Sequence, residues 1–313
     1  MYIRTATLAD IPKIVSLLKL SLGEQMIPKS EAFWMWKHIE NPFGESLSLV
    51  AEDKGEIVAV RAFMKWEWIY QSRTFKALRA VDTAVHPLYQ GKGLFTKLTR
   101  MLVEKAKLDG YDFIFNTPNK KSLVGYCKMG WVKSGRIPVT IQFNSFFVGK
   151  KQNELLDIDE NLFIDTIKKI KFSTNGIRKK IDHNFLKWRY LDCPVHDYRF
   201  YTDGEFFMFV YRLKRKSTWK EMRIVELFFL KEMVELDLKE IFKRIQSIQT
   251  THQVNYTTII GSEFEVKMKG VFTISKVQIG PILTIKDLNL KGMKSVIFEK
   301  ANWDYKLGDL ELF

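Results

Sequence analysis

The sequence predicts a mixed chain, α+β or α/β, in which helices flank a central β-sheet. Residues 80–98 read as an apolar strand, a tight turn and an amphipathic helix. The turn sequence at 53–56, Asp-Lys-Gly-Glu, separates two apolar stretches and is typical of a β-hairpin. The short apolar stretch 112–116 follows the helix, and we expect it to pair in parallel with the strand before it, because a connection of about fifteen helical residues joins them.

The segments before 80–98 supply the other elements of the sheet. Residues 2–6 read as a short strand, and Thr7 or Asp10 can cap a following helix with an apolar face at Ile14, Leu17 and Leu18. An aromatic-rich segment at 31–39 ends in the turn Asn-Pro-Phe-Gly. Strands at 46–52 and 57–66 form the hairpin, and 75–85 is the strand that enters the glycine turn.

The turn within 80–98 has the properties of an anion site. Pro87 ends the strand because it has no N–H, and Gly91 and Gly93 permit positive φ where the backbone turns. The helix that follows begins with N–H groups that have no acceptor inside the helix, at the positive end of its dipole. The sequence therefore predicts that the start of this helix binds an anionic group.

Two motifs resemble the GNAT acyltransferase superfamily. The string 90–95, Gln-Gly-Lys-Gly-Leu-Phe, is similar to its pyrophosphate-binding signature, Gln/Arg-x-x-Gly-x-Gly/Ala, except that Phe95 stands where the family usually has a small residue. We expect this residue to move the helix slightly away from the pyrophosphate. Residues 119–131 resemble a second pattern, in which Asn119 precedes a helix that carries Tyr126 and closes at Gly130 and an aromatic residue. The spacings of P-loop and dinucleotide-binding motifs are absent.

The resemblance covers about residues 1–145 and implies the GNAT fold, a mostly antiparallel sheet flanked by helices. It implies acetyl-CoA or another short acyl-CoA as the acyl donor and no metal. Tyr126 would protonate the coenzyme A thiolate, and Asn119 would contact the pantetheine. The remaining implied cofactor contacts come from the end of the strand and from the glycine turn: Thr83, Ala84, Val85, Gln90, Gly91, Lys92, Gly93, Leu94 and Phe95.

The general base is less well defined. Asp82 lies on the strand beside the glycine turn and is the first choice, followed by His38. Glu31 and Glu67 lie in segments that also border the expected acceptor side, and ordered water replaces a direct base in many members of the superfamily. Strand alternation puts Arg79 and Asp82 on opposite faces, so they do not automatically form a pair. The alternative for Tyr126 is a buried helix tyrosine that bonds to the backbone.

The second half repeats features of the first. The spacing Phe185-x-x-Trp188-Arg189-x4-Pro194 matches that of 33–42, and 222–226 echoes 78–82. From this internal similarity we infer a GNAT catalytic domain at 1–148 and a degenerate GNAT-like domain at 149–313 that shapes the acceptor cleft. No Gln/Arg-x-x-Gly loop lies between Val225 and Leu238, so the second domain should not hold a pyrophosphate. Chance agreement of tryptophan and proline spacings is the alternative.

Composition narrows the class of protein. The 313 residues carry a net charge of +14, but the aromatic residues lie in apolar strand-like runs, which argues against a nucleic-acid partner. The two cysteines suit a reducing compartment, and no Cys/His cluster has metal-ligand spacing. The N-terminus lacks a signal-peptide core and no stretch is long enough to span a bilayer, so we expect a cytoplasmic protein. The sequence predicts no particular oligomeric state.

We therefore expect an acyl-CoA-dependent N-acyltransferase that acts on a small-molecule primary amine. The favoured acceptor, a nucleotide-linked amino sugar of surface-polysaccharide synthesis, rests on resemblance to two-lobed GNAT proteins. The basic run at 178–180 suits such an acceptor, as do tryptophans able to stack on a base or sugar, namely Trp34, Trp36, Trp66, Trp68 and Trp188. Alternatives are a peptide, lysine or polyamine acceptor, and, in a different class, a non-catalytic acyl-CoA-binding sensor or adaptor.

Overall fold

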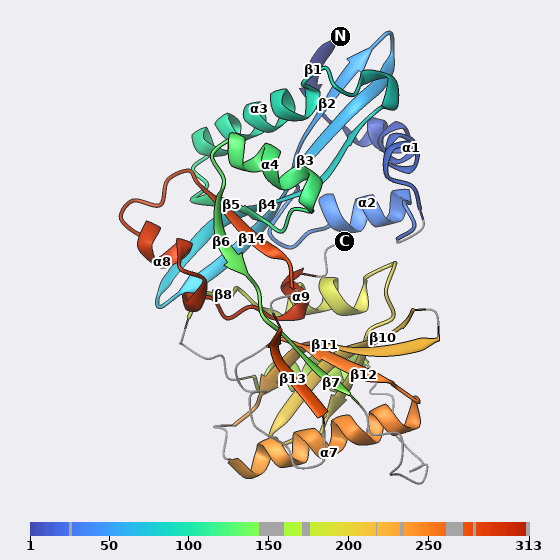
Figure 1. Ribbon diagram of the computed structural model, residues 1–313, viewed down its shortest axis with the longest axis vertical. Helices are drawn as coiled ribbons and strands as arrows, with labels where there is room; N and C mark the ends of the chain where they lie inside the picture. The colour runs from blue at the N-terminus through green and yellow to red at the C-terminus, as the bar shows by residue number, and fades with distance from the viewer. Residues whose placement is uncertain are drawn as a thin grey trace.

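The computed structural model describes residues 1–24, 27–143, 160–170, 176–216, 218–231, 235–260, 272–277 and 280–310. Within these residues the chain forms two β-sheets, one in the upper half of Figure 1 and one in the lower half. Strands far apart in the sequence are neighbours in both sheets, as the adjacent green and orange strands in Figure 1 show.

The first sheet contains eight of the described strands. In order across the sheet they are β1 (Tyr2–Thr5), β2 (Leu47–Asp53), β3 (Glu56–Tyr70), β4 (Arg73–Val85), β5 (Phe113–Asn116), β14 (Ile282–Asp287) and β6 (Val132–Arg136), with β8 (Arg178–Lys179) paired to β3. The predicted hairpin is confirmed as β2 and β3, and its turn places Lys54 and Gly55 at φ 52° and 82°. The predicted parallel pair is confirmed as β4 and β5.

Four helices cover the two faces of this sheet, α1 (Ile11–Leu22), α2 (Glu31–His38), α3 (Leu94–Leu108) and α4 (Lys120–Lys128). Helices α1 and α2 share one apolar cluster with the sheet, and α3 and α4 share another on the opposite face (Figure 1). Local sequence sets their starts, because Ser30 accepts the N–H of Phe33 at 3.1 Å and Asn119 accepts that of Ser122 at 2.9 Å.

The second sheet contains six of the described strands. Their order is β13 (Phe272–Val277), β7 (Val139–Phe143), β12 (Tyr256–Ile259), β11 (Trp219–Phe229), β10 (Phe207–Lys216) and β9 (Arg199–Thr202). Helix α7 (Glu235–Thr251) packs its apolar side against one face of this sheet. The remaining described α-helices are short: α5 (Glu160–Ile167), α6 (His183–Leu186), α8 (Lys294–Phe298) and α9 (Leu307–Leu310).

Six strands of the first sheet, β2 to β5 with β14 and β6, have the same order and directions as the six described strands of the second sheet. In each, a parallel pair follows a long antiparallel hairpin, and the parallel ladder ends at an arginine, Arg79 in β4 and Arg223 in β11. A register shift follows in both hairpins, beyond Ala80 in the first sheet and beyond Ile224 in the second. These are the positions at which 222–226 echoes 78–82, so the internal repeat of the sequence coincides with a repeat of structure.

The two sheets also exchange a strand. After β6 in the first sheet the chain continues directly into β7, which lies between β12 and β13 of the second sheet. After β13 the chain returns through β14, which lies between β5 and β6 of the first sheet. The inferred boundary at 148/149 falls outside the described residues. The first half contributes β7 to the second sheet, and the second half contributes β14 and the short β8 to the first. The division into a catalytic and a degenerate GNAT-like domain therefore remains a prediction.

A continuous core joins the two halves. The indole of Trp36 donates to the carbonyl of Trp188, and the indole of Trp188 donates to the carbonyl of Trp36, each at 2.7 Å. The two rings stack at 4.7 Å. This reciprocal contact relates the two segments that the Phe-x-x-Trp spacing links in the sequence. No helix among the described residues is long and apolar enough to cross a membrane.

Candidate active site

The glycine turn has the geometry that the sequence predicts. Strand β4 ends at Val85, a short 3-10 turn spans Pro87–Tyr89, and α3 begins at Leu94. Gly91 and Gly93 both adopt φ 76°, a conformation that favours glycine, and a Cβ at either position would have no atom within 4 Å. Among the described residues no side chain caps α3, so its first-turn amides lack a side-chain acceptor at the positive end of the helix dipole.

Whether Phe95 moves the helix away from the pyrophosphate remains a prediction, but the neighbours of its side chain are defined. Its ring points into the gap between α3 and α4, where it meets Tyr126 edge-on at 5.6 Å. A Cβ at Gly125 would lie 3.2 Å from this ring, so glycine in α4 is what makes room for it. The side chain therefore supports Tyr126, and only the backbone amide of Phe95 remains at the anion site.

Strands β4 and β5 separate beside this turn. Their parallel pairing ends at Arg79 opposite Phe115, so residues 80–85 have no partner in β5. The residues expected to contact pantetheine, Thr83, Ala84 and Val85, lie on this unpaired edge. On its other edge β4 still pairs with β3, which holds the strand in place.

A β-bulge sits at the start of the unpaired edge. Arg61 of β3 pairs with Thr83, whereas Phe63 pairs with Ala80, so β4 carries one extra residue between these pairs. The bulge resets the alternation of side chains. Val81 packs on the face of α1 and α2, and Asp82 contacts α2 on this same face.

The opposite-face expectation for Arg79 and Asp82 is therefore wrong, because it assumed an unbroken strand. Arg79 lies two residues before Val81 and shares its face. Arg79 and Asp82 nevertheless do not bond to each other, because each bonds to a different helix. Arg79 donates to the backbone carbonyls of Asp309 and Leu310 in α9, while Asp82 bonds to α2.

Tyr126 lies on the other face of the sheet, buried beside α3. Its hydroxyl is 2.5 Å from Nη2 of Arg61, which is fully buried in β3. Arg61 also donates through Nη1 to the carbonyl of Val81 in the bulge, at 2.6 Å. One guanidinium thus links the predicted general acid to the splayed part of β4. Because arginine only donates, Tyr126 accepts this bond, and its own proton has no acceptor among the described residues.

Asp82 and His38 come together on the α2 face. Nε2 of His38 is 2.8 Å from Oδ2 of Asp82, and Nδ1 is 2.8 Å from Oγ of Ser46. The sequence analysis did not anticipate Lys37, whose Nζ lies 2.7 Å from the same Asp82 oxygen. Lys37 and His38 are each 1% exposed, whereas the Asp82 side chain is 15% exposed. Both contacts involve Oδ2, which leaves Oδ1 directed elsewhere.

These contacts set the charge state of the cluster. Burial alone raises the pKa of Asp82, but the Lys37 charge and the His38 hydrogen bond outweigh it and hold this pKa well below its ordinary range. Burial lowers the pKa of His38 and that of Lys37, against the opposing effect of Asp82. Since Lys37 already neutralises Asp82, we infer a neutral His38 that donates from Nε2 to Asp82 and accepts at Nδ1 from Ser46. Asp82 is ionised and a weak base.

The other predicted contacts occupy the rim of this region. Asn119 is exposed and caps α4 with its side-chain oxygen, which leaves its amide nitrogen for a ligand. Gln90 is also exposed and donates to the carbonyl of Val85 at 3.2 Å. Glu67, an alternative base, instead pairs with Lys180 at 2.7 Å. Catalytic and cofactor-binding roles for all these residues remain predictions. No group of side chains with metal-ligand geometry lies in the described part of the chain.

The expected stacking tryptophans are core residues. Their exposed fractions lie between 0% and 5% for Trp34, Trp36, Trp66, Trp68 and Trp188. Lys179 of the basic run is buried too, in ion pairs with Glu226 and Asp309 at 2.7 and 2.8 Å. The expectation that the five tryptophans and Lys179 contact the acceptor is wrong. Four of the rings pack in the core that joins the two sheets, and Trp34 packs against α1 and the first sheet.

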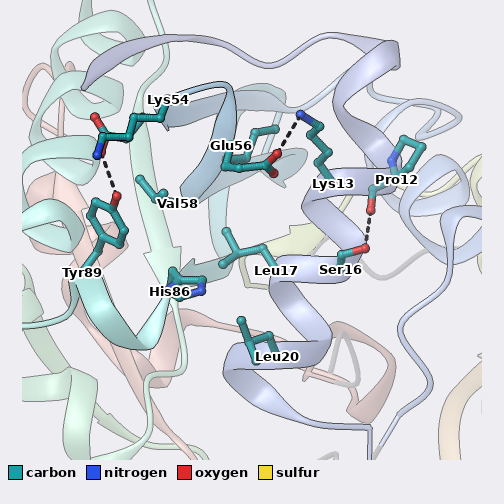
Figure 2. A pocket seen from close by; sticks show the side chains of 12 residues that line it. Pro12, Lys13, Ser16, Leu17, Leu20, Lys54, Glu56, Val58, His86 and Tyr89 are labelled. Carbon is teal, nitrogen blue, oxygen red and sulfur yellow. Dashed lines mark hydrogen bonds and ion pairs between the residues drawn. The ribbon is translucent and has the colours of Figure 1, made fainter.

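A cavity of about 570 Å³ lies on the α1 side of the glycine turn. As Figure 2 shows, its walls are α1, the β2–β3 hairpin and the turn before α3, which contributes His86 and Tyr89. Tyr89 donates to Asp53 at 2.7 Å, and Lys13 pairs with Glu56 at 3.6 Å. Neither Tyr126 nor Asp82 lines this cavity, so it adjoins the predicted cofactor turn without containing the predicted catalytic groups.

Arg61 and Lys37 are the site residues that sequence reasoning missed. Arg61 had a signal, because it is the only charge in the apolar stretch 57–64 and a buried charge requires polar partners. Lys37 had a weaker one, since a lysine at the end of a helix is usually solvated. Ser46 had none, because nothing local links it to His38.

Comparison with known proteins agrees with this geometry. Residues 2–133 match the family model described as an acetyltransferase (GNAT) domain, a range that includes the glycine turn, Arg61, Asp82 and Tyr126. No curated protein sequence matches the chain. This match associates the chain with enzymes of the N-acyltransferase type, which use acyl-CoA donors.

Solved structures share the fold over nearly the whole chain. A GCN5-related N-acetyltransferase from Anabaena variabilis is 12% identical, with a TM-score of 0.65, over 92% of this chain and 74% of that one. A probable N-acyltransferase from Enterococcus faecalis is 9% identical, with a TM-score of 0.63, over 94% and 74%. N-myristoyltransferase from Saccharomyces cerevisiae, with bound myristoyl-CoA, is 9% identical, with a TM-score of 0.52, over 82% and 72%. The predicted GNAT fold is confirmed.

Proposed function

We propose that the chain is an acyl-CoA-dependent N-acyltransferase that moves an acetyl or other short acyl group to a primary amine, which attacks the thioester directly. The observation that carries the proposal is the hydroxyl of Tyr126. It accepts from Arg61 at 2.5 Å, and its own proton has no acceptor among the described residues. It does so beside the bulge of β4 and within the region that matches a GNAT domain.

The donor side is built around the turn before α3. An acyl-CoA would supply an activated thioester and a polyanionic pyrophosphate. The amides at the start of α3 suit that pyrophosphate, since they lack partners and open space surrounds Gly91 and Gly93. The unpaired edge of β4 would bond the pantetheine arm through Thr83, Ala84 and Val85. Asn119, on the rim, would contact the same arm.

The acceptor side is the α2 face. Asp82 is ionised, and its Oδ1 would hold an N–H of the incoming amine, because Lys37 and His38 both occupy Oδ2. The low pKa of Asp82 suits orientation of the amine better than retention of its proton. In this proposal the proton leaves through water, and His38 keeps Asp82 in place.

The general acid acts from the opposite face. Tyr126 donates its proton to the leaving sulfur, which makes the thiol a better leaving group. The two faces therefore have separate tasks, with the cofactor and its acid on the α3 side and the amine on the α2 side. The separation of β4 from β5 connects them.

The favoured acceptor remains an amino sugar, in its nucleotide-linked form. This choice rests on the resemblance and on the net charge of +14, which suits an anionic acceptor. It no longer rests on tryptophan stacking, since these side chains are buried. A lysine peptide or a polyamine are the alternative acceptors, and a sensor without turnover is the alternative of a different class. A cytoplasmic location belongs to the same proposal.

An acetyl-transfer assay with four acceptors tests the proposal. Release of coenzyme A thiol from acetyl-CoA is measured with a uridine-diphosphate amino sugar, free glucosamine, a lysine peptide and spermidine. We expect the highest turnover with the nucleotide-linked amino sugar, and a loss of about 100-fold in kcat with unchanged acetyl-CoA affinity for Tyr126→Phe. Higher turnover with the peptide or with spermidine would show that this amine, and not the amino sugar, is the acceptor. Tight acetyl-CoA binding without turnover on any amine would favour the sensor.

A further inference from the structure

We propose that Arg61 is a positioning residue that stabilises the negative charge left on Tyr126 when this tyrosine protonates the departing sulfur. The inference rests on the proposed function, because it takes Tyr126 as the general acid. Neither the family match nor the sequence motifs assign a role to Arg61.

Arg61 is held rigidly at the place where this charge would form. Its guanidinium donates to Tyr126 at 2.5 Å, to the carbonyl of Val81 at 2.6 Å and to Oγ1 of Thr99 at 3.2 Å. These acceptors come from α4, β4 and α3, so three elements fix one planar group. Its exposed fraction is 0%, so bulk water does not compete for the N–H groups of the guanidinium.

The charge of Arg61 lacks a carboxylate partner. Among the described residues no Asp or Glu forms an ion pair with it, and its neighbours are the rings of Phe63 at 4.8 Å, Tyr126 at 5.6 Å and Phe95 at 5.8 Å. Arginine stays protonated in proteins, so a full positive charge is buried here. Asp82 acts on this charge through space without bonding to it. A buried charge with no carboxylate in contact is costly, and a tyrosinate at position 126 would be a counter-ion in direct contact with the guanidinium.

The proton balance of the reaction shows why such a cation is useful. The amine nitrogen forms a bond to the carbonyl carbon, the C–S bond breaks with its electron pair on sulfur, and the Tyr126 proton moves to that sulfur. An ordinary tyrosine has a pKa near 10 and an ordinary thiol near 8.5, so this transfer is unfavourable by a factor of about 30 in water. A guanidinium bonded to the phenol oxygen favours the anion that results. The surplus amine proton leaves on the acceptor side, and Tyr126 regains a proton from solvent.

Substitution of Arg61 tests this role with acetyl-CoA as the donor and hydroxylamine as a small amine acceptor. We expect Arg61→Gln to lower kcat by about 10- to 100-fold with unchanged KM and unchanged calorimetric Kd for acetyl-CoA, and Arg61→Lys to recover part of the loss. The double variant with Tyr126→Phe should be no slower than Tyr126→Phe alone, because the two side chains act in one step. Arg189→Gln is the matched control, since Arg189 is also fully buried and donates to a tyrosine, Tyr198, at 2.9 Å.

The outcomes separate this inference from the proposed function. Wild-type turnover in Arg61→Gln, or a loss equal to that of Arg189→Gln when corrected for folded protein, would overturn the role of Arg61 and leave the proposed function standing. A raised Kd for acetyl-CoA would make Arg61 a binding residue and overturn it as well. Absence of acetyl-CoA binding in the wild type would overturn both the role of Arg61 and the proposed function.

Discussion

At the scale of single residues, Asp82 is defined by the two donors that share one of its oxygens. Lys37 and His38 both approach Oδ2, at 2.7 and 2.8 Å, from the buried side of α2. A carboxylate with one neutralising lysine does not require a charged histidine, so His38 is best described as a neutral donor that holds Asp82 in position. The two contacts leave Oδ1 as the atom that we propose meets the amine.

A neutral buried His38 predicts a pH dependence of stability. The pKa of His38 is lowered in the folded chain, so below about pH 6.5 the unfolded chain binds a proton that the folded chain does not. The free energy of unfolding should therefore fall as the pH drops from 7 to 5.5, by at most about 1.4 kcal/mol per pH unit from this group. Urea unfolding at both pH values should show a smaller fall for His38→Gln. His183→Gln, at an exposed position, controls for loss of an imidazole, and an unchanged pH slope in His38→Gln would contradict the assignment.

Residues that the motifs name were predictable, and their partners were not. Tyr126 follows from its place in a helix that starts at Asn119, and Asp82 follows from its place beside the glycine turn. Their hydrogen-bond partners, Arg61 and Lys37, lie 65 and 45 positions away in the sequence. Local patterns carry no information on such pairs, because only the packing of α3, α4 and α2 on the sheet brings them together.

At the scale of elements, the strand, turn and helix around 80–98 form as predicted. The bulge in β4 is the feature that positions their functional groups. It places Asp82 on the α2 face and leaves the carbonyl of Val81 to Arg61. A bulge has no reliable local sequence signature when it lacks glycine, and Val81 and Asp82 read as ordinary strand residues. This is why alternation assigned Arg79 and Asp82 to opposite faces.

The exchange of β7 and β14 between the two sheets could not be predicted from the sequence either. Both are short apolar stretches, and such a stretch fits equally well into either of two sheets with the same topology. For β7 the direct connection from β6 decides the matter, because Ile137 and Pro138 do not adopt the positive φ that a two-residue hairpin turn requires. The consequence is that neither half of the sequence contains a complete sheet of its own.

At the scale of the whole molecule, the two halves are joined by matched contacts. The reciprocal Trp36 and Trp188 hydrogen bonds lie between the segments that repeat in the sequence. Glu226 stands at the position that echoes Asp82, and it too pairs with a buried lysine at 2.7 Å, here Lys179 from β8. The sequence repeat predicted that Asp82 and Glu226 occupy equivalent positions. It did not predict that the cluster of Lys179, Glu226 and Asp309 would link the second sheet to α9.

The buried ion-pair cluster predicts a large loss of stability for Lys179→Met. Lys179 is 3% exposed and is the shared partner of Glu226 and Asp309, so its removal leaves two carboxylates buried together. We expect the free energy of unfolding to fall by about 3–5 kcal/mol in chemical denaturation. Adding Glu226→Gln should recover part of this loss. Lys168→Met removes an exposed ion pair of similar length, 2.9 Å, and should leave stability unchanged. Equal stability of the two lysine variants would show that the buried cluster carries no net charge interaction.

The central claim is that the glycine turn before α3 holds the pyrophosphate of an acyl-CoA, and calorimetric binding of acetyl-CoA tests it most directly. Gly93→Asp places a carboxylate at this turn, whereas Gly204→Asp places the same charge at a hairpin turn of the second sheet. The two glycines have matching φ, 76° and 79°, and neither has an atom within 4 Å of a Cβ position. We expect Gly93→Asp to weaken acetyl-CoA binding at least about 10-fold through repulsion, and Gly204→Asp to bind as the wild type does. Equal binding by the two variants, or no binding by the wild type, would contradict the account.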